Sequence, residues 1–310
     1  MVGRFAPSPS GPMHLGNART ALLAWLDTRS RGGSMVLRIE DLDRDRCRAE
    51  FAQAIRDDLT WLGLDWDEET APQSAREPAY RAALQRLDDQ GLLYECFCSR
   101  RQLAVATAPH GPGDEPAPYP GTCRALTPAE RERLRAQGRT PALRVRMPDE
   151  APAVRDRLHG ELHPAGGGDV MVRRSDGLHA YQLAVVVDDA ADGVTDVVRG
   201  DDLLGSAARQ MALQQLLGLP AVSYAHVPLV LGEDGARLAK RHGTMALWAL
   251  RASGVQPPAL VAAMASSAGL GDGRPLAAAE LVSEFRMERV SRLPWRPTAA
   301  DLAALATAES

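Results

Sequence analysis

A proline-rich loop near the start of the chain separates two regular elements and limits the folds in which they can be combined. Residues 7–12 contain three prolines and a glycine, which exclude a helix there. The short run 3–6 before the loop is extended, whereas apolar residues recur at helical spacing from His14 until Arg31-Gly32-Gly33. Residues 35–39 then form a second strand. The pattern predicts a βαβ unit whose loop meets the helix N-terminus, where phosphate groups bind favourably.

Regular and irregular segments alternate along the rest of the chain. The run Leu183–Val187 is continuously apolar and predicts a strand covered on both faces, and 226–231 predicts a further strand. Stretches rich in proline and glycine at 109–121 and 165–168 favour an insertion of short strands and loops between two halves of an α/β core. Helical spacing predicts the remaining elements at 48–62, 78–90, 203–217 and from about 246 to the end.

Composition indicates an ordinary soluble protein, for which we expect a cytoplasmic location. The chain has 310 residues, 45% of them hydrophobic and 25% charged, which suffices for two or three structural units. It has no apolar stretch near the roughly 20 residues that span a bilayer, and residues 1–9 do not resemble a secretory signal. Four cysteines in such a length favour thiols or a metal site over a disulfide scaffold.

Charge gives a weak indication of a nucleic-acid partner. The net charge is −4, so a globally basic surface is absent. Residues 124–157 nevertheless contain nine arginines and five acids, a local balance of +4. Such a patch could contact phosphates, although charge runs more often mark a solvated surface.

Two loops have the composition of a nucleotide site. His14, Gly16 and Asn17 stand at the predicted helix start, where Gly16 would let a ligand approach the backbone and His14 could donate to a phosphate. Residues 232–241 follow a predicted strand and end in a basic cluster, in which Lys240 could act as a point charge on a triphosphate. Taken singly, each loop could instead be a solvated polar turn or hairpin.

Together these segments resemble the glutamyl- and glutaminyl-tRNA synthetases of class I. The resemblance is carried by three N-terminal segments, 4–11, 14–17 and 38–43, and by 237–241, which is similar to the family's KMSKS loop. It covers about residues 1–245. Asn17 replaces a histidine, and arginines stand at both ends of the KMSKS-like loop. The resemblance implies adenylate formation from ATP, expected with Mg²⁺, in which His14 and Lys240 stabilise charge on the leaving pyrophosphate.

The amino-acid substrate implied by this family is L-glutamate, which has two carboxylates and an ammonium group. Arginine grips a carboxylate with two hydrogen bonds, and a carboxylate such as that of Glu40 could hold the ammonium. For each residue the alternative is a structural ion pair or, for Tyr181, a core aromatic. The resemblance points to these glutamate contacts: Arg4, Phe5, Ala6, Pro7, Ser8, Glu40, Tyr181 and Arg199.

Cysteines in the predicted insertion could bind zinc. Cys96 and Cys98 lie on one predicted short strand, and Cys123 could add a third sulfur. A metal would fix a segment with little core of its own. From chemistry alone the fourth ligand could be His110 or Tyr119, and reduced thiols without metal are the alternative. Tyr119, four residues before Cys123, resembles the Cys-x-Cys…Tyr-x-x-x-Cys zinc site of the glutamyl-queuosine tRNA(Asp) synthetase branch of the family. Cys47 is expected to be structural.

These expectations combine into one fold. We expect an α/β protein, in which a Rossmann-type parallel-sheet catalytic domain carries a zinc-bearing α+β insertion and a short helical C-terminal segment. The expected boundaries are 1–95 and 180–245 for the two catalytic halves, 96–179 for the insertion and 246–310 for the helical subdomain.

The length beyond Lys240 guides the expectation about the tRNA. Only 70 residues follow it, too few for the anticodon-binding region of a full glutamyl-tRNA synthetase. By resemblance, we therefore expect a monomer that activates glutamate without tRNA and transfers it to queuosine at the wobble position of tRNA(Asp). The alternatives are a shortened glutamyl-tRNA synthetase charging the acceptor end, a small-molecule nucleotidyltransferase and a catalytically silent RNA-binding paralogue.

Overall fold

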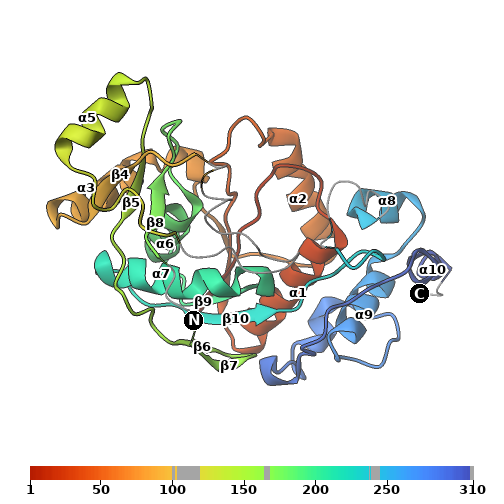
Figure 1. Cartoon of the computed structure of the whole chain (residues 1–310). Coiled ribbons are helices and arrows are strands. Elements are labelled where there is room, and N and C mark those ends of the chain that lie inside the picture. The colour runs from red at the N-terminus through yellow and green to blue at the C-terminus, as the bar shows by residue number, and fades with distance from the viewer. Residues whose placement is uncertain (100–101, 103–118, 164–167, 237, 239–244, 308–310) are drawn as a thin grey trace.

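The computed structural model describes residues 1–310 except 100–101, 103–118, 164–167, 237, 239–244 and 308–310. Its main sheet has seven strands in the order β3-β2-β1-β9-β10-β6-β7 (Figure 1). All neighbouring strands are parallel except β6 and β7, which are antiparallel. The strands are β1 (Val2–Phe5), β2 (Ser34–Leu37), β3 (Glu68–Glu69), β6 (Val154–Asp156), β7 (Gly160–Leu162), β9 (Asp196–Gly200) and β10 (Ser223–Val227).

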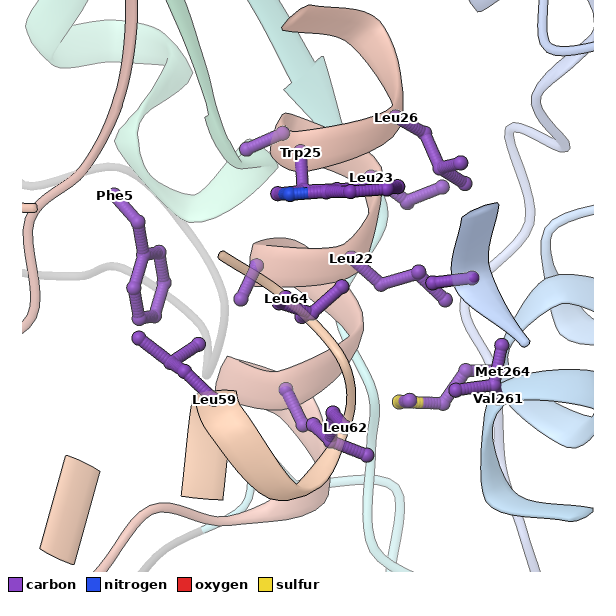
Figure 2. Close-up of a cluster of buried hydrophobic side chains, with 14 of the residues drawn as sticks. Phe5, Leu22, Leu23, Trp25, Leu26, Leu59, Leu62, Leu64, Val261 and Met264 are labelled. Carbon is purple, nitrogen blue, oxygen red and sulfur yellow. The ribbon is translucent and has the colours of Figure 1, made fainter. Parts of the chain in front are cut away.

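The predicted βαβ unit is confirmed, and its helix lies directly on the sheet. α1 (Leu15–Ser30) packs against β1, β2 and β9, and β1 pairs with β2 in parallel. Gly3 permits this approach, because a Cβ there would lie 2.0 Å from Thr28 Oγ1. Figure 2 shows Leu22 of α1 on the side of Val261 and Met264, all within the largest hydrophobic cluster.

Strand alternation sends charged side chains to the opposite face of the sheet. Val198 of β9 joins the core on the α1 side, whereas Val197 packs in a separate cluster with residues of α7 (Leu204–Leu216). Because successive strand residues point to opposite faces, Arg199 lies on the α7 side. By the same alternation from Gly3, Arg4 of β1 also points away from α1 and toward Asp189 of α6.

The apolar run predicted as a strand at 183–187 is helical, so that prediction was wrong. It lies within α6 (Tyr181–Ala191), which packs against α7, against α3 (Glu77–Asp89) and against strand β8 (Val170–Arg173). Neighbours on several sides bury Leu183 to Val186 without a break. A helix covered in this way loses its polar stripe, and its sequence then reads like that of a covered strand.

A second, antiparallel sheet follows α3 in the chain. It has the order β4-β5-β8, with β4 (Leu93–Cys96) and β5 (Ala142–Val145). α5 (Pro128–Ala136) projects from this region at the upper left of Figure 1. Cys96 ends β4 and Cys98 follows it, so the two cysteines do not share one strand as predicted. The predicted helices at 48–62, 78–90 and 203–217 are confirmed as α2 (Ala49–Trp61), α3 and α7.

The C-terminal part is only partly helical, contrary to the prediction. α8 (Leu247–Ala252), α9 (Pro257–Ser267) and α10 (Ala299–Ala304) are joined by short 3-10 turns and loops. Three glycines with positive φ, at 269, 271 and 273, and Pro294 and Pro297 interrupt the helical pattern. The apolar residues between them still enter the core against α1. Within the described ranges, every helix is too short or too polar to cross a bilayer.

Candidate active site

A cavity of about 280 Å³ lies where β1 and β2 end. Ser8, from the loop after β1, and Glu40, just after β2, line it together with Tyr181, the first residue of α6. Arg46 and Arg174 also border the cavity. Parallel α/β sheets bind ligands at the carboxyl ends of their strands, so this is the expected place for a substrate. Backbone bonds fix the two loops, because Glu40 N donates to Pro7 O at 3.0 Å.

Arg4 is a buried cation with few partners. Its ion pair, from Nε to Asp189 Oδ1, is long at 3.6 Å, and Nε has no hydrogen-bond partner among the described residues. A buried charge without good hydrogen bonds is unfavourable. A ligand carboxylate at Arg4 would therefore remove an unfavourable term as well as add a favourable one.

Glu40 has the complementary character. It is buried, and its Oε1 lies 3.2 Å from Arg38 Nη2. Burial raises the pKa of Glu40, and the positive charges of Arg38 and Arg4 offset only part of this effect. A carboxylate whose ionised form is disfavoured gains from an added cation. The ammonium group of an amino acid would supply that cation.

Tyr181 lies at the centre of the predicted glutamate contacts. Burial raises the pKa of its hydroxyl, and the charges of Arg199, Glu40 and Arg4 all act on that group. Such interactions require proximity, so these four residues surround one region. Phe5 differs, because its side chain is packed in the core on the α1 side, which leaves only its backbone for a ligand.

Arg199 is held by the protein at every nitrogen. Nε donates to His226 Nε2 at 3.0 Å, Nη1 to Gln210 Oε1 at 2.7 Å and Nη2 to Leu203 O at 3.3 Å. Its guanidinium carbon also lies 4.9 Å from the ring centre of Tyr224. Each Nη carries a second hydrogen that these bonds leave for a ligand. Arg199 is therefore a pre-oriented cation.

Sequence reasoning missed an acidic network behind the cavity. Arg38 Nη2 donates to Asp189 Oδ1 at 2.6 Å and Nη1 to Asp192 Oδ2 at 2.8 Å. Asp188 accepts hydrogen bonds from Gln73 and from the Tyr80 hydroxyl. These carboxylates lie on α6, where a strand was predicted, so their common helical face was hidden. Asp188-Asp189 at the end of an apolar run was the available signal.

His14 caps α1 at the predicted nucleotide loop. Its Nδ1 accepts from Gly16 N at 3.1 Å and from Asn17 N at 3.3 Å, while Asn17 Oδ1 accepts from His14 N at 3.4 Å. An Nδ1 that accepts leaves the ring proton on Nε2, where it can be donated to a phosphate. A Cβ at Gly16 would lie 3.1 Å from this ring, which explains the glycine.

Lys240, the other predicted catalytic residue, lies outside the described residues. The segments on either side of it are described. Leu238 packs against the same core cluster as Met245 and Met13. Leu247 N donates to Met13 O at 2.9 Å, and His14 forms an isolated bridge with Ala246. The chain therefore returns from this segment directly beside the nucleotide loop.

The three cysteines of the insertion come together as predicted and could hold a metal ion. The sulfurs of Cys96, Cys98 and Cys123 lie within 4.8 Å of one another. The Tyr119 hydroxyl lies 3.4 Å from Cys96 Sγ and 3.7 Å from Cys98 Sγ, and Cys98 Sγ lies 3.6 Å from Cys123 Sγ. Ligands of one tetrahedral zinc ion are roughly 3.3–3.8 Å apart, so the donor set fits. His110, the alternative ligand, lies outside the described residues.

The thiols differ in acidity because Arg144 lies beside them. Burial opposes ionisation of Cys96, but hydrogen bonds, that from Tyr119 first among them, and the charge of Arg144 lower its pKa overall. Burial raises the pKa of Cys98 to about 11. The guanidinium carbon of Arg144 lies 3.7 Å from the ring centre of Tyr119. A cation at this place favours thiolates, which are the metal-binding form.

The arginine-rich stretch 124–157 does not form a single basic surface. Arg157 is bonded to Asp27 of α1, and Arg144 is buried with its Nη1 on Asp169 O. The exposed arginines of the stretch include Arg133 and Arg135 of α5. Sequence composition could not distinguish arginines used inside the fold from those left on its surface.

The parallel sheet, the histidine-capped loop and the charged cavity beside it define a nucleotide-binding α/β enzyme. The family model described as tRNA synthetases class I (E and Q), catalytic domain, matches residues 1–302. The chain belongs to this family and is thus an enzyme of the ligase type.

Particular relatives are named more narrowly. The chain is 52% identical over 317 residues to the glutamyl-Q tRNA(Asp) synthetase of Symbiobacterium thermophilum, with 98% of each chain covered. It is 52% identical to the protein of the same name from Nocardia farcinica, covering 95% of this chain and 92% of that one. The crystal structure of a glutamate tRNA ligase from Elizabethkingia meningosepticum, in complex with its amino acid, superposes with a TM-score of 0.77 at 26% identity. That superposition covers 97% of this chain and 68% of the ligase.

Proposed function

We propose that the chain activates L-glutamate with ATP, without tRNA, and transfers the glutamate to queuosine at the wobble position of tRNA(Asp). The observation that carries the first step is the cavity in which Glu40 and Tyr181 face the buried cations Arg4 and Arg199. Opposite charges at this spacing suit an amino acid with two carboxylates and one ammonium.

In the first step an oxygen of the glutamate α-carboxylate attacks the α-phosphorus of ATP. The bond from that phosphorus to the bridging oxygen breaks, and pyrophosphate leaves with the electron pair. Glu40 and Ser8 hold the amino acid, and Arg4 and Arg199 hold carboxylate charge. His14, Gly16 and Asn17 bind the nucleotide at the α1 N-terminus, where the helix dipole favours phosphate. His14 and Lys240 stabilise charge on pyrophosphate, with Mg²⁺ bound to the ATP.

In the second step a queuosine hydroxyl attacks the carbonyl carbon of the adenylate. An ester forms, the hydroxyl loses its proton and AMP leaves. Two relatives that match over nearly their whole length carry the name glutamyl-Q tRNA(Asp) synthetase, which supports this acceptor. Arg46 and Arg174 border the cavity and could contact phosphates of an anticodon loop, and the arginines of α5 could extend that contact.

We infer that one zinc ion is bound by Cys96, Cys98 and Cys123, with Tyr119 as the fourth ligand. The distances between these donors support this ligand set. When bound, the metal would have a structural role, joining the end of β4 to the segment 119–123. The catalytic steps above involve other residues.

Two assays test the proposed function separately. Glutamate-dependent exchange between ATP and pyrophosphate, measured without tRNA, reports the first step, and Lys240→Ala should abolish most of it. Transfer is measured with labelled glutamate on tRNA(Asp) that carries either queuosine or guanine at the wobble position, each with its terminal adenosine removed. Labelling only of the queuosine form is expected. Labelling of intact tRNA(Glu) alone would instead identify a shortened glutamyl-tRNA synthetase.

A further inference from the structure

Three residues on neighbouring strands form a hydrogen-bonded row behind the proposed glutamate site. Asp156 belongs to β6, His226 to β10 and Arg199 to β9, and these strands are adjacent in the sheet. His226 and Arg199 are direct partners in the parallel register. His226 is fully buried, and its Nδ1 lies 2.7 Å from Asp156 Oδ2, while its Nε2 lies 3.0 Å from Arg199 Nε.

The hydrogen-bond directions in this row follow from chemistry. Arginine Nε is always a donor, so Nε2 of His226 must accept. The ring proton therefore lies on Nδ1 and is donated to Asp156. Burial lowers the pKa of His226 and the charge of Arg199 adds to this effect, both of which favour the neutral ring. Asp156 is itself fixed, because its Oδ1 accepts from Leu158 N at 2.9 Å and from His159 N at 2.8 Å.

We propose that His226, oriented by Asp156, is a positioning residue that sets the direction of the Arg199 guanidinium toward a glutamate carboxylate. His226 holds Nε, the nitrogen nearest the side-chain stem, so both Nη atoms take a defined direction. Gln210 and Leu203 then engage one hydrogen on each Nη. This inference rests on the proposed function, because it assumes that Arg199 contacts the amino acid.

Two isosteric variants separate this role from general stability. In His226→Gln the side-chain oxygen can replace Nε2 as the acceptor for Arg199. In His226→Asn the side-chain amide can replace Nδ1 as the donor to Asp156, and the acceptor for Arg199 is lost. Both variants replace a buried ring by a smaller amide, so packing losses should be similar. Only the contact with Arg199 distinguishes them.

The measurement is the KM for L-glutamate and the KM for ATP in the tRNA-independent exchange assay, with the unfolding temperature of each variant alongside. His226→Asn should raise the glutamate KM roughly ten- to hundredfold, the usual effect of losing a hydrogen bond to a charged group. His226→Gln should restore most of the affinity, and the ATP KM should stay within about twofold in both.

Several outcomes would overturn the inference. One is an equal glutamate KM in the two variants, and another is an ATP KM that rises in parallel with that for glutamate. If neither variant folds, the imidazole ¹⁵N shifts of wild-type His226 decide, because a protonated Nε2 contradicts the proposed contact. A wild-type chain without any glutamate-dependent exchange would refute the proposed function itself, and this inference with it.

Discussion

Arg157 donates two hydrogen bonds to Asp27, from Nη1 to Oδ1 at 2.8 Å and from Nη2 to Oδ2 at 2.6 Å. The pair joins the end of β6 to α1, which are far apart in the sequence. Asp27 is buried, as is Asp196, whose Oδ1 lies 3.8 Å from Arg157 Nη2. The arginine thus compensates two buried carboxylates at once.

We expect Arg157→Ala to lower the free energy of unfolding by about 3–5 kcal/mol, because it leaves buried charge uncompensated. Chemical denaturation followed by circular dichroism would measure the change. Arg81→Ala is the control, since Arg81 forms an exposed pair with Glu77 and should cost less than about 1 kcal/mol. Equal effects of the two substitutions would contradict the role of Arg157.

Substrate binding can be tested at Glu40. Glu40→Gln keeps the size of the side chain and removes the charge that would face the substrate ammonium. The glutamate KM should rise roughly ten- to hundredfold while the ATP KM changes little. Glu50→Gln, on the exposed side of α2, should leave both constants unchanged. A normal glutamate KM in Glu40→Gln would argue against the proposed contact.

The metal site predicts a change that needs no activity assay. Cys98→Ser should lose the zinc of about one site per chain and should lower the unfolding temperature, because the metal contributes to folding of the insertion. Elemental analysis of purified protein gives the metal content. Cys47→Ser is the matched control, since Cys47 lies outside the cysteine cluster. Full zinc content in Cys98→Ser would rule out this ligand.

Asp58 predicts a pH-dependent stability. Burial raises its pKa from 3.8 to about 6, although Arg251 Nη1 lies 3.3 Å from Oδ1 and opposes the shift. A carboxyl whose folded pKa exceeds its unfolded pKa binds protons more tightly in the folded state. Its contribution to stability is therefore complete below about pH 4 and is lost as the pH rises through about 6.

Asp58→Asn removes this ionisation and should raise the free energy of unfolding at pH 7.5 by about 1–3 kcal/mol. The gain should shrink toward zero as the pH falls to about 4. Thermal unfolding at several pH values would follow it. Asp57→Asn is the control, because Asp57 is exposed and should show no such trend. A gain independent of pH would point to a cause other than ionisation.

Local sequence signals predicted the first βαβ unit and much of the site. The loop at 7–12 and the glycines that end α1 fix the entry to that unit, and strand ends place Ser8 and Glu40 at one edge of the sheet. The cysteine cluster was also predicted, because its residue types have few other uses at that spacing.

What escaped prediction depends on contacts between distant segments. The run 183–187 became a helix because α3, α7 and β8 cover it, and no local pattern contains those neighbours. The error hid the relation between Tyr181 and Asp189, which share a helix and both face the substrate cavity or its charges. The pairing of Arg157 with Asp27 was likewise invisible in a stretch that looked like a basic surface.

The full set of bonds on Arg199 has a consequence for selectivity. A free arginine side chain can extend or fold to meet ligands of different length, at a cost in rotamer entropy. A guanidinium already held at Nε, Nη1 and Nη2 has no such reach and acts as a fixed gauge. Aspartate, shorter than glutamate by one methylene, would leave its carboxylate short of a cation that cannot move to meet it.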